Sequence, residues 1–383
     1  MYDLIFVSLE DWDEVWRRNQ FLCASLARRF PAMKILFAGL PRNVSHNLRH
    51  GNLRALWGKA TRTLPDFPNI TVTHALKLFP DSIPLGRRIN ERMARRHIRR
   101  AARGLGMTDP LLWLNPHSAL HMAGAMDESA VIYDITDDWA MAPSFSERDR
   151  QLIIEQDQAL CRRADLVVVC SEALEASRRA RCRDLLHLPN GVENTRYAAI
   201  PDATQPGRWP GPVFGYTGTI HADRFDVDLV AGLAGSFPQG SIVLVGPDHL
   251  KREEKEKLAA RGNIHITGPV PYAEIPEVMA HFDVCIVPHV ETKFTNSLNP
   301  LKLWEYLASG KPVVSTNVAG FSDYPQFCRI ASGGDAFAQA CREALGENGA
   351  HRAERRAEAG KHSWDQRVDV LVQTLSSKGL IKA

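Results

Sequence analysis

Short apolar segments alternate with stretches of helical character along this chain, and the series runs twice. Continuously apolar segments are typical of strands that helices cover on both faces. The first series comprises residues 2–9, 33–40, 110–116, 130–136 and 164–171, and the second comprises 212–220, 241–247, 263–270, 282–288 and 311–316. This alternation predicts parallel, doubly wound sheets. A Pro- and Gly-rich stretch separates the series at residues 200–212 and reads as a linker. We therefore predict an α/β protein of two tandem Rossmann-like domains.

The length agrees with this division, because 383 residues are too many for one ordinary core. We expect one domain in residues 1–199 and the other in residues 200–362. Hydrophobic residues at 44% and charged residues at 24% exclude a disordered or coiled-coil protein. Apolar runs stay below the roughly 20 residues of a bilayer span, and no basic segment precedes the first apolar stretch, so we expect no signal peptide. The scattered cysteines form no CxxC pair, which favours the cytoplasm.

The stretch FTNSLNPLKLWEYLASGKPVVST at 294–316 is the most informative. Asn299 suits an N-cap and Pro300 the first helical position, and Gly310 is the expected stop. A helix N-terminus suits a diphosphate. The candidates to bind it are Asn299, Pro300, Leu301 and Lys302. Glu305 lies on the same face as Lys302, about 4.5 Å further along the axis. It would hold the hydroxyls of a ribose; the alternative is a surface Lys–Glu pair.

A second turn, GYTGTIHADRFD at 215–226, follows a strand. Gly218 and Thr219 would let backbone amides approach an anion, although an ordinary structural turn explains them equally well. The stretch matches neither GxGxxG nor GxxxxGK[ST], which argues against a nicotinamide site and a P-loop NTPase.

The stretch YDITDDW at 133–139 places Asp134, Asp137 and Asp138 at the carboxyl end of a strand, where open α/β sheets bind ligands. A carboxylate in a partly dry cleft gains a raised pKa and suits a general base. Helix capping explains at least one of these carboxylates. Clustered carboxylates also bind metals, but the spacing matches no EF-hand loop.

Two further loops follow strands and are candidates to face a cleft. One carries Asp11, Trp12, Arg17 and Arg18, and the other carries Asn115 and His117. His117 and His121 are four residues apart, as two zinc ligands on one helix face would be. No third ligand accompanies them, so we expect packing or capping and no metal.

Charge is distributed unevenly. Residues 17–103 contain 19 Lys and Arg against 3 Asp and Glu, a balance of +16, whereas the whole chain carries +3 and the remainder therefore −13. Seven arginines within this region fall on an arc of about 140° of one helix: Arg88, Arg92, Arg95, Arg96, Arg99, Arg100 and Arg103. A one-sided basic helix suggests a polyanionic partner; the alternative is a solvated arginine face.

The 294–316 stretch, together with GYTGTI, LPNGV and IYDITDDW, resembles the bacterial GT-B glycosyltransferases. The family 4-like enzymes of teichuronic acid and exopolysaccharide assembly look most similar, and the likeness covers nearly the whole chain. The resemblance implies two Rossmann-like domains facing a cleft, and a last helix, within residues 363–383, that crosses back to the first domain. It implies transfer of a sugar from a nucleoside diphosphate sugar, with UDP or GDP as the nucleotide, and no cofactor.

Residue by residue, Lys302 is similar to the basic residue that binds the donor diphosphate and Glu305 to the carboxylate that binds the ribose. Gly218 and Thr219 resemble the glycine turn that faces the phosphates. Val270 and Tyr272 lie in GPVPY, which resembles the segment near the nucleobase.

Asp137 falls where the xanthan glucuronosyltransferase, a distant relative, has its catalytic base. Retaining family 4 enzymes usually show two glutamates eight residues apart, but Ser297 stands eight before Glu305. This departure favours an inverting mechanism in which Asp137 deprotonates the acceptor. On the acceptor side we expect Asp11, Trp12, Arg18, His117 and Asp138.

In GT-B enzymes the first domain takes the acceptor. Anionic lipid attracts each nearby Lys or Arg by about 1 kcal/mol, so four arginines at the surface would supply roughly 4 kcal/mol. We expect docking on the inner face of the plasma membrane beside a lipid-linked or glycan acceptor. Two alternatives are a nucleotide-sugar epimerase of the same architecture and a nucleic-acid-binding protein. The second lacks aromatic interleaving and a reading motif, and we expect no nucleic acid partner.

Overall fold

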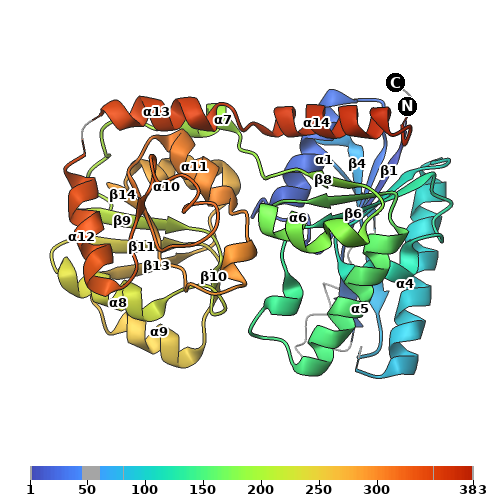
Figure 1. The fold of residues 1–383 in the computed structure, drawn as a ribbon, viewed down its shortest axis with the longest axis horizontal. Helices are drawn as coiled ribbons and strands as arrows, with labels where there is room; N and C mark the ends of the chain where they lie inside the picture. The colour runs from blue at the N-terminus through green and yellow to red at the C-terminus, as the bar shows by residue number, and fades with distance from the viewer. Residues whose placement is uncertain (1, 45–60, 81, 348, 382–383) are drawn as a thin grey trace.

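The computed structural model describes residues 2–44, 61–80, 82–347 and 349–381, and two mostly parallel sheets dominate this part of the chain (Figure 1). The first sheet has the order β3-β4-β2-β1-β5-β6-β7-β8. Its strands are β1 (Leu4–Val7), β2 (Ile35–Asn43), β3 (Thr61–Leu64), β4 (Phe67–Lys77), β5 (Leu111–Leu114), β6 (Ala130–Ile135), β7 (Leu166–Val169) and β8 (Leu185–His187).

The second sheet has the order β13-β11-β9-β14-β15-β16. Its strands are β9 (Val213–Thr217), β11 (Ser241–Val245), β13 (Ile264–Gly268), β14 (Val284–Val287), β15 (Val313–Ser315) and β16 (Arg329–Ile330). A short parallel pair, β10 (Ile220–His221) and β12 (Asp248–His249), lies beside it. Most of the predicted apolar segments form these strands, which pair in parallel; most of them are buried as expected, but β13 is partly exposed.

Helices cover both faces of the first sheet. One apolar cluster joins it to α4 (Pro84–Gly104), α5 (Glu147–Arg163) and α6 (Glu172–Arg178), and another joins its opposite face to α1 (Arg18–Arg29) and α14 (Trp364–Ser377). Short 3₁₀ helices follow strands β5, β6 and helix α6 at η1 (His117–Met122), η2 (Trp139–Met141) and η3 (Arg179–Arg181).

The second sheet is enclosed in the same way. One face packs on α8 (Val227–Ser236), α9 (Arg252–Ala259) and α12 (Gly334–Leu345), and the other on α10 (Ile275–Ala280), α11 (Leu301–Ser309) and α13 (Ala350–Ala359). Two 3₁₀ helices, η4 (Tyr272–Glu274) and η5 (Thr295–Ser297), precede α10 and α11. The cluster beneath α1, α11, α13 and α14 is continuous across both sheets, so one apolar layer joins the two halves.

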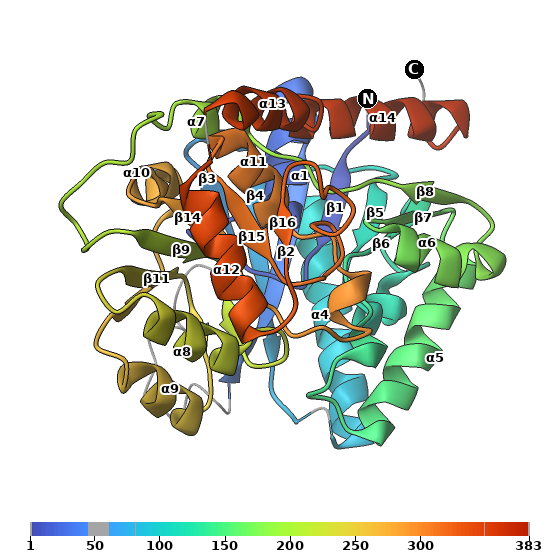
Figure 2. The same ribbon diagram turned by 60° about the vertical axis from the view of Figure 1, so that its left-hand side comes forward.

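The chain passes between the two sheets twice. It crosses after β8, through α7 (Asn194–Ala198), and returns between α13 and α14, along the upper edge in Figure 1 and Figure 2. The backbone N–H of Val192 donates to the His362 carbonyl at 2.9 Å, which ties the crossings together. Trp364 then stacks on Phe21 of α1, with ring centroids 5.2 Å apart. The predicted boundaries at 199/200 and 362/363 lie within these crossings.

Two local expectations were wrong. The first sheet is not wholly parallel, because β3 pairs antiparallel with β4 and closes one edge as a hairpin. Helix α11 begins at Leu301 with Pro300 as its N-cap residue, and no side chain caps it. The predicted stop is right, since Gly310 ends α11 in the left-handed conformation with φ 76°. Among the described residues, no helix combines the length and apolar character that a bilayer crossing needs.

Candidate active site

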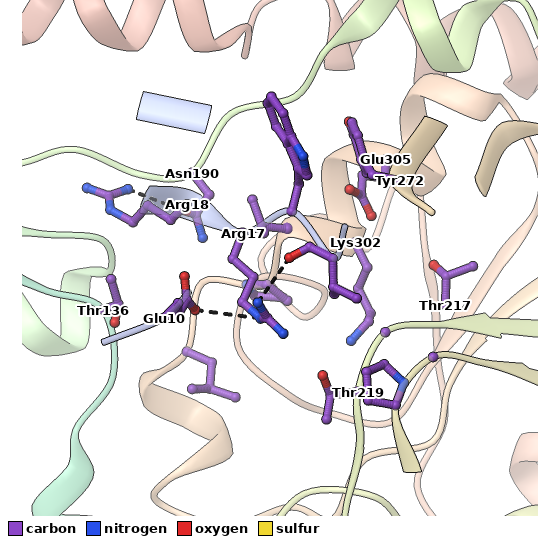
Figure 3. Close-up of a pocket in the computed structure, with 18 of the residues that line it drawn as sticks. Glu10, Arg17, Arg18, Thr136, Asn190, Thr217, Thr219, Tyr272, Lys302 and Glu305 are labelled. Atoms are coloured by element: carbon purple, nitrogen blue, oxygen red, sulfur yellow. Dashed lines mark hydrogen bonds and ion pairs between the residues drawn. The ribbon is translucent and has the colours of Figure 1, made fainter. Parts of the chain in front are cut away.

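A cavity of about 410 Å³ opens where the carboxyl ends of the two sheets face each other. The loops after β1 and β6 line it from the first half. The turn after β9, the segment after β13 and the start of α11 line it from the second. The predicted donor-binding residues all line this cavity: Gly218, Thr219, Val270, Tyr272, Asn299, Pro300, Leu301, Lys302 and Glu305. The predicted donor-binding residues, which span about 90 positions of the sequence, therefore share one site with residues of the first half (Figure 3).

Lys302 lies over the turn that carries Gly218. Its Nζ donates to the Tyr216 hydroxyl at 3.2 Å and lies 4.6 Å from the centre of that ring. Gly218 has φ 130°, and a Cβ there would meet Lys302 Nζ at 3.1 Å. Only glycine combines this conformation with the close approach of the ammonium. The turn and the lysine therefore form one cationic surface.

Two residues that the sequence did not single out strengthen this surface. Arg224 lines the cavity, and its buried Nε has no hydrogen-bond partner among the described residues. His289 is buried beside it, and its Nε2 lies 3.3 Å from the Tyr216 hydroxyl. Burial, and then Lys302 and Arg224, hold the pKa of His289 well below its ordinary value. The imidazole is therefore neutral, and the positive charge belongs to the lysine and the arginine.

Glu305 lies deeper, with two tyrosines around it. Burial raises the pKa of its carboxyl to about 7. The buried hydroxyls of Tyr197 and Tyr272 lie beside it, a hydrogen bond from Tyr197 partly opposes the rise in this pKa, and both rings contribute to the cavity wall. A carboxyl and two hydroxyls grouped at the cavity wall suit a ligand that brings hydroxyl groups of its own.

Asn299 lines the cavity without capping α11. Its Oδ1 accepts the backbone N–H of Asn190 at 2.8 Å, and the Asn190 side chain donates to the Asn299 carbonyl at 2.5 Å. These bonds join the crossing segment to the helix that carries Lys302. They leave the first amides of α11 without the predicted side-chain cap.

Asp137 lies where the first cavity meets a second one of about 280 Å³. Thr136, Asp137 and Trp139 line both cavities. Burial raises the pKa of the Asp137 carboxyl, although Arg224 and the hydrogen bond from Thr136 at 3.1 Å oppose this rise. A half-buried carboxyl that borders two cavities can exchange a proton with a group that enters from either side.

The second cavity contains the predicted residues His117 and Asp138. Asp138 is paired with Arg178 at 2.8 Å, and Arg178 also reaches Asp157 at 3.4 Å. Burial lowers the pKa of His117, so its imidazole is neutral at pH 7. The described residues hold no group of three or more His, Cys, Asp or Glu side chains that would ligate a metal ion.

The structure places three residues expected on the acceptor side, Asp11, Trp12 and Arg18, differently from what we predicted. Asp11 and Trp12 line neither cavity: Asp11 accepts the Leu40 N–H at 2.9 Å, and Trp12 packs edge-on against Phe37 at 5.1 Å. The loop turns these side chains toward β2. Arg18 does line the first cavity, but its guanidinium is committed to a buried pair with Asp134 at 3.1 Å.

Glu10 lies one residue before Asp11 and does enter the cavity. Its Oε1 is 3.8 Å from Arg17 Nε, whereas its buried Oε2 has no hydrogen-bond partner in the part of the chain that the structure describes. The stretch SLEDWDEVWRRNQ contains both acids, and sequence alone could not tell which of them faces inward.

The seven arginines of the predicted basic face of α4 divide into two sets. Arg99 and Arg103 pair with Asp127, and Arg95 donates to the His121 carbonyl at 3.5 Å. The other four are exposed and have no ion pair among the described residues: Arg88, Arg92, Arg96 and Arg100. They repeat every four residues and form a stripe along α4. Exposed apolar side chains cluster around the start of this helix: Leu78, Phe79, Ile83, Leu85 and Ile89.

The comparisons with known proteins agree with this geometry. Residues 211–347 match the family model described as glycosyl transferases group 1. A putative teichuronic acid biosynthesis glycosyltransferase of Bacillus subtilis strain 168, TuaH, is 31% identical over 254 residues. The match covers 61% of this chain and 64% of TuaH, somewhat less than two thirds of that relative. A 2-deoxystreptamine N-acetyl-D-glucosaminyltransferase of Streptomyces fradiae is 30% identical over 149 residues, which are 36% of this chain and 34% of that protein.

Solved structures extend the likeness over the whole fold. HepE of Anabaena, in complex with UDP and glucose, superposes with a TM-score of 0.68 at 17% identity and covers 98% of this chain and 100% of its own. The apo structure of OtsA gives 0.67 at 13% identity and covers 100% of both chains. The fold is thus that of the GT-B glycosyltransferases, as predicted.

Proposed function

We propose that this protein transfers a sugar from a nucleoside diphosphate sugar to a hydroxyl group of an acceptor. One observation carries the proposal: Lys302, the Gly218 turn, the start of α11 and Glu305 converge on a single cavity. The cations and the helix N-terminus suit a diphosphate. The Glu305 carboxylate suits the two hydroxyls of a ribose.

The charge of the leaving group would fall on the same surface. As the bond from the sugar to the phosphate oxygen breaks, negative charge develops on the diphosphate. Lys302, Arg224 and the start of α11 line the same cavity and would stabilise that charge without reorganising. We propose on this basis that no metal ion is needed, because the protein's own cations would meet the charge.

Asp137 is proposed as the base. The acceptor would enter from the second cavity, its hydroxyl proton would pass to Asp137, and its oxygen would bond to the sugar carbon as the diphosphate leaves. The position of Asp137 between the two cavities and its raised pKa support this role.

The acceptor is proposed to be a lipid-linked or polysaccharide hydroxyl at the inner face of the plasma membrane. The likeness to TuaH, named for teichuronic acid biosynthesis, supports a cell-envelope product. The exposed stripe on α4 supports attraction to anionic lipid, and the exposed apolar side chains beside it would insert among the headgroups.

Calorimetric titration tests the donor site. UDP, GDP and ADP would be titrated in EDTA into the wild type, into Lys302→Ala and into Lys293→Ala. Lys293 is exposed on the loop before α11 and serves as the control. UDP is the first candidate, because HepE was solved with UDP. We expect one nucleotide to bind and Lys302→Ala alone to weaken it; binding of none of the three would contradict the proposal.

A further inference from the structure

Glu10 lies between the two ends of the cavity. In Figure 3 the labelled side chains run from Tyr272 and Glu305, through Lys302 and Arg17, to Glu10 and then Thr136. If Glu305 holds the ribose and Lys302 the diphosphate, the next group along this line is the sugar to be transferred. Glu10 therefore borders the space between the phosphates and the base, Asp137.

Among the described residues, one oxygen of the Glu10 carboxylate, Oε2, has no hydrogen-bond partner. Arg17 is its nearest cation, but the separation of 3.8 Å from Nε to Oε1 exceeds a hydrogen bond. Arg17 Nη1 instead donates to the Val15 carbonyl at 3.0 Å and to Asp13 at 3.4 Å. Glu10 Oε2 is buried and receives no hydrogen bond from the described part of the chain, although the Glu10 side chain as a whole is 27% exposed. An acceptor in this state costs free energy unless a ligand supplies a donor.

The ligand group that satisfies Glu10 is a neutral donor. A phosphate would be repelled by the carboxylate, and Asp137 already adds negative charge nearby. Burial raises the pKa of Glu10 to about 7, and Asp137 contributes to that rise. Hydroxyl groups donate hydrogen bonds without adding charge, and the two oxygens of one carboxylate can accept from two neighbouring hydroxyls.

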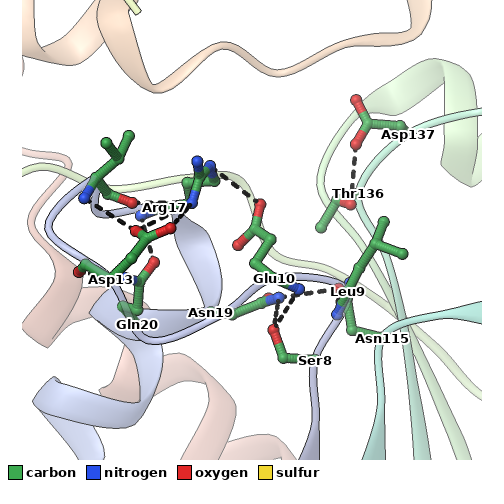
Figure 4. Close-up of polar contacts among 11 residues, drawn as sticks. Ser8, Leu9, Glu10, Asp13, Arg17, Asn19, Gln20, Asn115, Thr136 and Asp137 are labelled. Atoms are coloured by element: carbon green, nitrogen blue, oxygen red, sulfur yellow. Dashed lines mark hydrogen bonds and ion pairs between the residues drawn. The ribbon is translucent and has the colours of Figure 1, made fainter. Parts of the chain in front are cut away.

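The loop that carries Glu10 is held rigidly (Figure 4). The backbone N–H of Glu10 donates to Ser8 Oγ at 2.9 Å. The Asn19 side chain donates to Ser8 Oγ and to Asn115 Oδ1, both at 2.9 Å, and the Leu9 N–H donates to Asn115 Oδ1 at 3.2 Å. A carboxylate on such a loop is preorganised, as a selective binding group must be.

We propose that Glu10 binds neighbouring hydroxyls of the transferred sugar and so selects donors that carry a free diol beside the reacting carbon. The inference rests on the proposed function, because it assumes a nucleotide sugar in this cavity. Glu10 has no role toward the nucleotide itself. A substitution of Glu10 should therefore weaken the binding of the sugar part of the donor and leave the binding of the nucleotide part nearly unchanged.

The experiment separates these parts. UDP and UDP-glucose would each be titrated into the full-length wild type, Glu10→Gln and Glu14→Gln, with unfolding curves for all three. Glu14 is exposed on the same loop, so its substitution removes the same charge outside the cavity. Hydrogen bonds to a charged group are stronger than those between neutral groups. We therefore expect Glu10→Gln to lower the affinity for UDP-glucose by about tenfold or more and the affinity for UDP by less than about twofold. Glu14→Gln should change neither.

A second variant controls for misfolding. Glu10→Asp keeps the charge but shortens the reach, and we expect it to retain UDP binding and to weaken UDP-glucose. A monodeoxy UDP-glucose that lacks the contacted hydroxyl should bind the wild type more weakly than UDP-glucose does. Glu10→Gln should bind the two ligands equally well, because the contact is already lost.

The outcomes distinguish the two proposals. If Glu10→Gln lowers the affinities for UDP and UDP-glucose equally, or lowers neither, the proposed role of Glu10 is overturned. In that case UDP binding by the wild type would still support the donor site. Failure of the wild type to bind both ligands would overturn the proposed function and this inference with it.

Discussion

Arg18 and Asp134 form a buried bidentate ion pair, with Nε and Nη2 of the guanidinium each 3.1 Å from a carboxylate oxygen. The remaining nitrogen, Nη1, donates to Asn190 Oδ1 at 3.0 Å. This pair joins the first turn of α1 to the end of β6 and to the segment that crosses between the sheets. The loops that follow β1 and β6, with Glu10 and Asp137, are therefore fixed relative to each other.

We expect Arg18→Met to destabilise the protein by about 3–5 kcal/mol, because it leaves Asp134 buried without its cation. Urea unfolding measures the loss. Arg29→Gln is the matched control, since Arg29 and Asp369 form an exposed pair at 3.8 Å, and its effect should stay within about 0.5 kcal/mol. Equal effects of the two substitutions would contradict this account.

Gly218→Ala should impair both folding and the donor site. The conformation at φ 130° strains any side chain, which we expect to lower the free energy of unfolding by about 1–3 kcal/mol. The new Cβ would also displace Lys302, so UDP affinity should fall. Gly232→Ala provides the comparison: a Cβ there meets nothing within 4 Å, and alanine should stabilise α8 by about 0.5–1 kcal/mol. Unchanged UDP affinity in Gly218→Ala would argue against the placement of Lys302.

Glu305 should make stability depend on pH. Its pKa in the folded protein is raised to about 7 from 4.5, so the folded state holds the proton more tightly. The stabilisation is full below about pH 4.5 and is lost as the pH rises to about 7, by roughly 3 kcal/mol in all. Glu305→Gln should remove the share of this decline that Glu305 contributes and leave the share of Glu10, whose pKa is also raised to about 7. Unfolding free energies between pH 5 and pH 8 test it, and parallel curves for the two proteins would refute it.

Nucleotide binding should show the opposite trend. The ribose hydroxyls would donate to the ionised Glu305 carboxylate, so wild-type affinity for UDP should rise through about pH 7. The phosphate itself titrates near pH 6, and the informative quantity is therefore the difference between wild type and Glu305→Gln. That difference should grow with pH; a constant difference would mean that Glu305 does not hold the ribose.

The arginine stripe should govern membrane binding. Replacement of Arg88, Arg92, Arg96 and Arg100 by Gln should weaken sedimentation with phosphatidylglycerol vesicles by about 4 kcal/mol in all. A charge-matched variant of α9 and its flank, with Arg252, Lys255, Lys257 and Arg261 changed to Gln, should bind as the wild type does. Equal wild-type binding to neutral and anionic vesicles would contradict the proposed docking.

Local patterns predicted the donor side of the cavity well. Lys302, Glu305 and Gly218 belong to a helix start and a glycine turn, whose positions follow from short-range backbone preferences. The prediction that Asn299 caps α11 was wrong, because its side chain instead accepts a hydrogen bond from Asn190, which is 109 positions away. The local sequence does not indicate such a distant partner.

The residues that the sequence missed depend on how the two halves meet. Arg224, Tyr197 and Glu10 gain their roles only when loops from separate domains close one cavity. Trp12 was assigned to the acceptor side, but its ring packs against Phe37 and Phe67. Burial of the indole against these rings stabilises the protein more than exposure in the cleft would. The β3–β4 hairpin was missed within the basic region, where polar residues interrupt the apolar pattern.

The most direct test of the account is the release of UDP from UDP-glucose in EDTA, with water as the acceptor, by the wild type, Lys302→Ala and Lys293→Ala. We predict slow release by the wild type and by Lys293→Ala, and release at least about 100-fold slower by Lys302→Ala, which loses stabilisation of the leaving diphosphate. Equal rates for the wild type and Lys302→Ala would contradict the central claim that Lys302 and its turn form the site of sugar transfer.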